Sequence, residues 1–221
     1  MERREDGQGI QIAKAIAAFV CAAGLLVTAA WVFGIEALKF APEGTVSMKF
    51  LTAFSFIMAG VVLFCLAELL ENREGLAQLV LPVATSVIFL IMASILFSVF
   101  FGIRTGIENL FVKEDPQKAY AGLPGMPAVG ALVGFVIISA IGLFSTGGIR
   151  QTRPFLAPLG ALAALLGAIT LLGYALNNPI LQMEAQNLAP PMAILTAFLF
   201  VLLGAGLVSL GHAATMEDEE E

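Results

Sequence analysis

The chain has 221 residues, of which 59% are hydrophobic and 13% are charged, with a net charge of −6 and a mean hydropathy of +0.93. A soluble domain averages about 45–50% apolar and about 25% charged residues, so this composition is typical of a membrane protein. The acidic balance and the two cysteines exclude a basic nucleic-acid-binding protein and a disulfide scaffold.

A helix that crosses a bilayer needs about 20 predominantly apolar residues, and each charge near its centre costs about 2.5–3.5 kcal/mol. Six stretches have this length and almost no internal charge: residues 12–33, 50–70, 79–101, 128–144, 155–176 and 193–210. The sequence therefore predicts an all-α integral membrane protein with six transmembrane helices in one membrane domain, residues 1–221.

The positive charges predict the orientation of these helices. Lys and Arg in short loops favour the cytoplasmic side of a membrane. Six of them lie in the segments on one side, namely Arg3, Arg4, Lys14, Arg73, Arg150 and Arg153. We expect both termini to be cytoplasmic, in a prokaryotic inner membrane, with residues 215–221 as a short acidic tail. Glu68, the most deeply placed acid, is expected to reach the interface from its helix end.

Two strings in the sequence repeat each other at long range. Residues 51–56 (LTAFSF) and Gly60 recur 144 positions later as residues 195–200 (LTAFLF) and Gly204. A methionine precedes both strings at the same spacing, at Met48 and Met192. So many matches in one register indicate an internal repeat.

A shorter string recurs in the loops at half that spacing. Residues 34–38 (GIEAL) match residues 106–110 (GIENL), and residues 178–181 are a looser copy. The fourth stretch is interpreted as a degenerate middle copy, with Met126 before it and Phe135 and Gly142 inside it.

These matches predict three tandem helix pairs, at about residues 10–75, 76–150 and 151–214. An even number of helices in each copy keeps the copies parallel, related by an axis along the membrane normal. Small residues let membrane helices approach closely, and threonines hydrogen-bond either to their own helix or across to a neighbour. The positions expected to pack helices are Thr52, Gly60, Gly130, Gly134, Gly160, Gly167, Thr196 and Gly204.

The outer loops supply the one polar constellation. Short interfacial segments are expected at residues 34–40, 106–112 and 179–188, anchored by aromatic residues. The anchors are Trp31, Phe40, Phe111 and Tyr174. Around a threefold axis, a ligand-binding site on the outer face would consist of Glu36, Arg104, Glu108 and Asn178. The alternative is that these are solvated residues at the starts of helical segments.

Other reactive groups are scarce. His212 is the only histidine, and Cys21 and Cys65 do not have metal-binding spacing. No phosphate loop or catalytic signature is present. We therefore expect no enzyme activity, no metal, no cofactor and no buried ion pair.

The pattern Met-x3-Thr-Ala-x2-Phe-x3-Gly, at residues 48–60 and 192–204, resembles the repeated helix pairs of some bacterial signalling proteins. These are the N-terminal membrane modules of sensor histidine kinases and diguanylate cyclases. The resemblance covers most of the chain and implies membrane-associated sensing or signal relay. Such modules normally precede a catalytic domain, which this chain does not contain, so output is expected through a separate partner.

The sequence thus predicts a sensor-like or scaffold module that contacts the lipid bilayer and a membrane protein partner or a second copy, and no nucleic acid. The first alternative is an accessory structural subunit of a larger membrane complex. The second is a small-solute transporter or channel.

Overall fold

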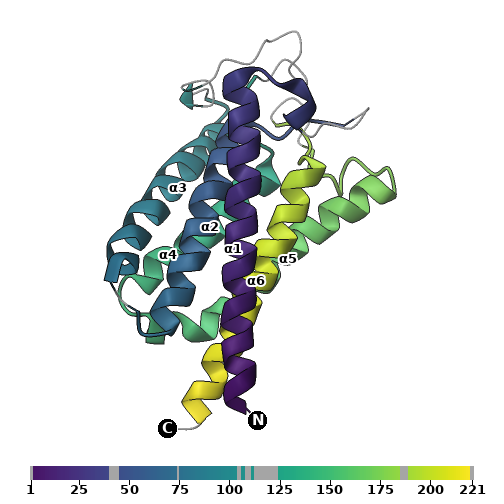
Figure 1. Cartoon of the computed structure of the whole chain (residues 1–221). Helices are drawn as coiled ribbons and strands as arrows, with labels where there is room; N and C mark the ends of the chain where they lie inside the picture. The colour runs from purple at the N-terminus through teal and green to yellow at the C-terminus, as the bar shows by residue number, and fades with distance from the viewer. Residues whose placement is uncertain are drawn as a thin grey trace.

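The computed structural model describes residues 2–39, 45–73, 75–103, 106–107, 111, 124–184 and 189–219, with side chains from residue 7 to residue 213. Within these ranges the chain forms six α-helices and one short 3-10 helix (Figure 1). They are α1 (Glu2–Phe33), η1 (Glu36–Lys39), α2 (Phe50–Leu70), α3 (Gly75–Phe101), α4 (Val129–Ser145), α5 (Ile149–Ala175) and α6 (Ile194–Glu219).

Five of the helices, all except α4, are long and apolar enough to cross a membrane. The fourth, α4, is apolar but has 17 residues. The prediction of an all-α fold is confirmed, and the five helices indicate a multi-pass membrane protein. The sixth span stays a prediction.

Several helices extend beyond the predicted spans. α1 begins ten residues before position 12, α5 six residues before position 155, and α6 continues nine residues past position 210. Hydropathy marks only the apolar part of a helix, whereas backbone hydrogen bonding continues through the polar residues beyond it.

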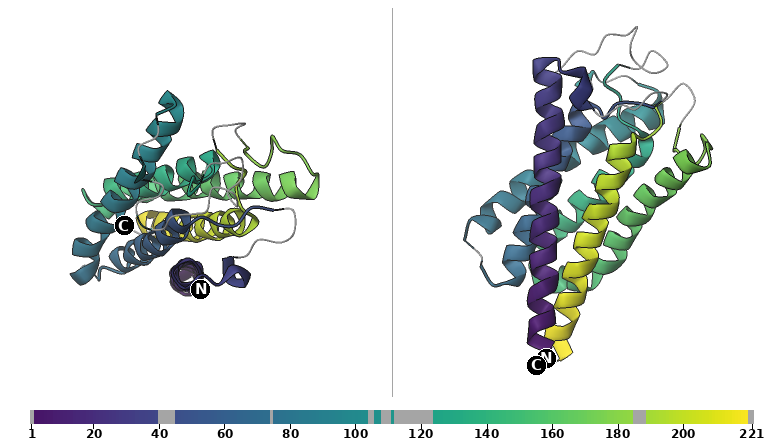
Figure 2. Two further views of the ribbon diagram at one scale, coloured as in Figure 1. Left: turned by 90° about the horizontal axis from the view of Figure 1, so that it is seen from above. Right: turned by 45° about the vertical axis from the view of Figure 1, so that its right-hand side comes forward.

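The inner set of helices is α2, α4 and α6, and the outer set is α1, α3 and α5. α2 and α6 are 67% and 56% buried along their spans, against 28%, 33% and 28% for α1, α3 and α5. Each outer helix packs between two inner ones: α1 between α2 and α6, α3 between α2 and α4, and α5 between α4 and α6. The start of α1 and the end of α6 lie at one end of the bundle, here called the terminal end (Figures 1 and 2). The opposite end, which contains η1, is called the loop end.

Three phenylalanine rings fill the space where the inner helices meet. Phe56 of α2, Phe135 of α4 and Phe200 of α6 are each 0% exposed. Their ring centroids lie 4.7 Å apart for Phe56 and Phe135, 5.0 Å for Phe56 and Phe200, and 4.9 Å for Phe135 and Phe200. Tilted and edge-on aromatic contacts at this distance are favourable, so the rings join all three helix pairs.

In the first helix pair, α1 and α2, small residues let the two helices pack closely. A Cβ added at Gly60 of α2 would lie 2.8 Å from the Ala17 oxygen and 2.5 Å from the Cys21 sulfur of α1. A Cβ added at Gly24 of α1 would lie 2.8 Å from the Ala53 oxygen of α2. The two backbones can approach this closely only because these positions have no side chain.

The third helix pair makes the corresponding contacts. Gly204 of α6 faces Gly160 and Ala164 of α5, and Gly167 of α5 faces Ala197 and Val201 of α6. Gly60 and Gly204 are 144 residues apart, and Gly24 and Gly167 are 143 apart. The one-residue difference falls in the connection between the two helices.

The middle helix pair, α3 and α4, is packed differently. Gly142 of α4 faces the side chains of Thr85 and Val62, and Gly134 faces the ring of Phe200. Gly130 faces the side chains of Met183 and Met192. These glycines of α4 therefore accommodate neighbouring side chains, whereas Gly24, Gly60, Gly167 and Gly204 also accommodate backbone of the partner helix.

Candidate functional site

A charged cluster lies between α1 and α2 near the terminal end. Lys14 Nζ donates a hydrogen bond to the Glu68 carboxylate and another, of 2.9 Å, to Glu71 Oε2. The same Glu71 oxygen lies 3.3 Å from Arg73 Nε. The Lys14 and Glu68 side chains are 21% and 20% exposed, so this ion pair is partly buried. Arg73 is 70% exposed.

This cluster was not predicted from the sequence, because each charge was considered separately. Lys14 was counted among the positive charges that set the orientation, and Glu68 was expected to reach the interface. Both lie inside candidate membrane spans. Two opposite charges in neighbouring apolar helices predict a pair, because each is costly there alone. That signal was available in the sequence.

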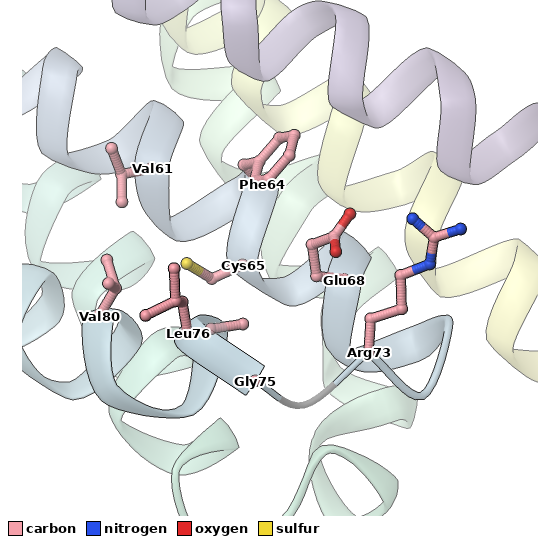
Figure 3. A pocket seen from close by; sticks show the side chains of 9 residues that line it. Val61, Phe64, Cys65, Glu68, Arg73, Gly75, Leu76 and Val80 are labelled. Atoms are coloured by element: carbon pink, nitrogen blue, oxygen red, sulfur yellow. The ribbon is translucent and has the colours of Figure 1, made fainter.

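A cleft of about 490 Å³ opens beside the cluster, between the end of α2 and the start of α3. Figure 3 shows the Glu68 carboxylate and the Arg73 guanidinium on one side of it, and apolar side chains on the other. The lining consists of Val61, Phe64, Cys65, Glu68, Arg73, Gly75, Leu76, Ala77 and Val80. The cleft is thus an apolar groove with a charged end.

A second cleft, of about 340 Å³, lies between α4 and α5, again where one helix pair meets the next. Its lining is Ile141, Phe144, Gln151, Thr152, Phe155 and Leu159, none of which is charged. The third junction, between α6 and α1, is closely packed: a Cβ added at Gly9 would lie 3.0 Å from the Ser209 oxygen.

A small polar cavity of about 10 Å³ lies among the inner helices near the loop end. Thr52, Ala131 and Thr196 line it, together with Lys49, which is only 5% exposed. The volume is close to that of one water molecule and excludes a larger ligand. Lys49 directly precedes α2.

The predicted outer site is only partly described. Glu36 Oε1 accepts a 2.8 Å hydrogen bond from Lys39 Nζ, which itself lies 4.1 Å from the Trp31 ring centroid. Asn178 Oδ1 accepts a 3.0 Å hydrogen bond from the Ile180 amide. Arg104 and Glu108 lie outside the described residues. Glu36 and Asn178 thus serve local structure, and their convergence on a ligand stays a prediction.

The matching loop strings do not occupy matching places. Gly34, with φ of 69°, ends α1, whereas α3 is ended by Gly102, with φ of 65°, four residues before Gly106. In both cases the residue after the glycine donates its amide hydrogen bond to a carbonyl five residues back, as in a Schellman motif. α5 ends in the same way at Asn177.

Two predicted aromatic anchors make equivalent hydrogen bonds. Trp31 Nε1 of α1 donates to the Met48 oxygen, and Tyr174 Oη of α5 donates to the Met192 oxygen, each at 2.9 Å. Each bond ties the end of an outer helix to the segment before its inner partner. Of the other anchors, Phe111 packs on Phe50 and Phe54, and Phe40 lies outside the described residues.

The histidine and Cys21 each have a backbone partner. His212 Nδ1 lies 2.8 Å from the Val208 oxygen, one turn earlier in α6. The Cys21 thiol donates to the Ile57 oxygen at 3.3 Å, and neither cysteine is in a disulfide. Among the described residues, no cluster of three His, Cys, Asp or Glu side chains could hold a metal ion.

Comparisons with protein-family models, with curated proteins and with solved structures gave no match. The class of the protein therefore rests on its own fold and composition, which are those of a helical, multi-pass membrane protein.

Proposed function

We propose that the protein is a non-enzymatic sensor-like or scaffold module that acts through helix–helix contacts with a membrane partner. In this proposal α4 also spans the membrane, because 17 helical residues extend about 25 Å and the shortest spanning helices have about that length. The terminal end faces the cytoplasm of a prokaryotic cell, as the loop charges indicate.

The observation that carries the proposal is the closed centre of the bundle. Phe56, Phe135 and Phe200 are fully buried and in mutual contact where the three inner helices meet. A solute path along this axis would have to displace all three rings. The bundle is therefore better suited to presenting a rigid outer surface than to conducting a solute.

The outer surface is most apolar along α3. Nine large apolar side chains of α3 are exposed, against six on α1 and four on α5 among the described residues. Leu76, Val83, Leu90 and Phe97 recur every seven residues on one face of α3. Seven-residue spacing is typical of a helix that packs along a second helix, so we place the partner on α3.

Three tandem helix pairs are also part of the proposal. Equivalent glycine contacts in the first and third pairs support the repeat, as do the equivalent hydrogen bonds of Trp31 and Tyr174. In addition, each pair contributes one phenylalanine to the axis. Such repeated helix pairs are what the resemblance to signalling modules leads us to expect.

The test is extraction of the tagged protein from its native membrane together with surrounding lipid, followed by mass measurement and identification of what accompanies it. We expect a partner membrane protein, or a second copy, at a defined ratio. Phe97→Ala on α3 should lower recovery of the partner, whereas Leu172→Ala, a similarly exposed residue of α5, should not. Recovery as a monomer alone would contradict the proposal.

A further inference from the structure

We propose that the cleft between α2 and α3 is a binding site for one phospholipid whose headgroup carries both a phosphate and a primary ammonium group, as in phosphatidylethanolamine. An acyl chain lies along the apolar lining, and the headgroup lies at the end formed by Glu68 and Arg73 (Figure 3). This inference concerns the isolated protein and does not depend on the partner proposed above.

The cleft has the size and position that a lipid chain needs. Its volume of about 490 Å³ falls in the range of small-molecule sites, about 300–1,000 Å³. Phe64, Leu76 and Val80 are 44%, 78% and 38% exposed, so the groove is open at the side of the bundle where lipid would lie. Cys65 and Ala77 form its buried wall.

The charged end of the cleft suits a phosphate. Arg73 is 70% exposed, and its ion pair with Glu71 is made through Nε. This contact leaves the two terminal nitrogens for a bidentate interaction with phosphate oxygens, which the planar guanidinium favours. Arg73 follows the end of α2, at the depth where a headgroup lies if α2 spans the bilayer.

The same end also suits an ammonium group. Among the described residues, Lys14 and Arg73 balance Glu68 and Glu71, so these four side chains have no net charge and present both signs side by side. A zwitterionic headgroup matches this better than an anionic one. A primary ammonium can donate hydrogen bonds to the carboxylates, whereas the quaternary ammonium of phosphatidylcholine cannot.

The cleft between α4 and α5 provides an internal comparison. It occupies the corresponding junction but has no charged residue in its described lining. A lipid chain that lies there would meet no charged side chain in the lining, and in particular no carboxylate for an ammonium group. Headgroup selectivity should therefore depend on the α2–α3 cleft alone.

The test is native mass spectrometry of the delipidated full-length protein with an equimolar mixture of dioleoyl phosphatidylethanolamine, phosphatidylglycerol and phosphatidylcholine. We expect one tightly retained lipid, with the ethanolamine lipid preferred about fivefold, the effect of one hydrogen bond of about 1 kcal/mol. Preference for phosphatidylglycerol, or equal retention of the three lipids, would overturn the proposal.

Two variants with matched controls locate the site. Gly75 lies at the mouth of the cleft and a Cβ added there meets no atom within 4 Å, so Gly75→Trp should fill the mouth without strain and abolish retention. Gly7→Trp, an equally open position on α1, should not. Arg73→Gln should lower the retention of all three lipids, because it removes the phosphate contact, whereas Arg150→Gln at the α4–α5 connection should not. Glu68→Gln should remove the preference for the ethanolamine lipid, because it removes the carboxylate in the cleft lining that accepts from the ammonium. Selective retention by folded Gly75→Trp protein would overturn the proposal.

Discussion

The first and third helix pairs are alike, and the middle pair differs from both. In α1–α2 and in α5–α6, glycines allow one backbone to lie directly against the other, and an aromatic residue bonds to the segment before the inner helix. In α3–α4, Gly142 faces a threonine side chain, and Val99, three residues before Gly102, takes the place that Trp31 and Tyr174 hold before their own helix ends. In the first and third pairs, glycines thus allow contact between backbones, whereas in the middle pair Gly142 makes room for a side chain.

The open surface of the molecule lies at the middle pair, where the packing differs. Both clefts lie where the middle pair meets a neighbour, whereas α6 and α1 pack closely at the third junction. The middle pair also contains α3, the helix with the most exposed apolar side chains. The first and third pairs therefore form the rigid part of the bundle, and ligands and partners are expected at the middle pair.

The largest expected effect concerns the three rings that all pairs share. Phe135→Ala and Phe200→Ala should each lower the free energy of unfolding by about 3–5 kcal/mol, because each removes a fully buried ring and leaves a cavity. Unfolding in mixed micelles, followed by circular dichroism, measures this. A near-zero effect of Phe135→Ala would mean that the middle pair is not part of the common core.

The next effect separates the pairs. Gly60→Ala and Gly160→Ala should each cost about 1–3 kcal/mol, because the new methyl group meets backbone atoms that cannot move aside. Gly130→Ala on α4 should cost less, because it meets only the flexible side chains of Met183 and Met192. Gly75→Ala, in open space, is the control. Equal costs at positions 60, 160 and 130 would remove the distinction between the pairs.

The Lys14–Glu68 pair belongs to the first helix pair alone, since alanine and histidine stand at the corresponding positions 157 and 212. Lys14→Met should destabilise the protein by about 1–3 kcal/mol, because it leaves Glu68 partly buried without this partner. Glu68→Gln should cost less, because Glu71 still accepts a hydrogen bond from Lys14. The double variant should cost less than the sum of the two. Additive costs in this double-mutant cycle would show that the two charges do not interact.

The smallest effect tests the likeness of the first and third pairs. Trp31→Phe and Tyr174→Phe each remove one hydrogen bond to a methionine carbonyl, which contributes about 1 kcal/mol. Both should lower the thermal midpoint, Trp31→Phe by somewhat more, because it also shrinks the ring that lies against Lys39 Nζ. A shift for one variant and none for the other would break the correspondence.

Much of the fold could be predicted from the sequence. Apolar length located the helices, and α2 begins and ends at the predicted residues. The match at an offset of 144 residues marked the contact positions on the inner helices α2 and α6. Their contact partners on the outer helices α1 and α5 correspond at an offset of 143 residues. Those outer-helix partners, such as Ala17 and Gly160, share no recognisable string, because close approach requires only a small side chain and not a particular one.

The site was less predictable. Glu36 and Asn178 attracted attention by their sequence pattern, yet their recorded hydrogen bonds are to residues two or three positions away. The α2–α3 cleft depends on how two helices diverge, and a gap between helices leaves no mark in either sequence. Arg73 and Glu68 were visible as charges, but their common position at the cleft required the structure.

The most direct test of this account is site-specific photo-crosslinking in the native membrane from position 90 of α3 and from position 165 of α5. Leu90 and Leu165 are 64% and 54% exposed, so both positions contact the surroundings of the bundle. The account predicts a discrete crosslink to one membrane protein from position 90, and only lipid adducts from position 165. Lipid adducts alone from both positions, or the same protein crosslink from both, would contradict the claim that the middle helix pair carries the partner surface.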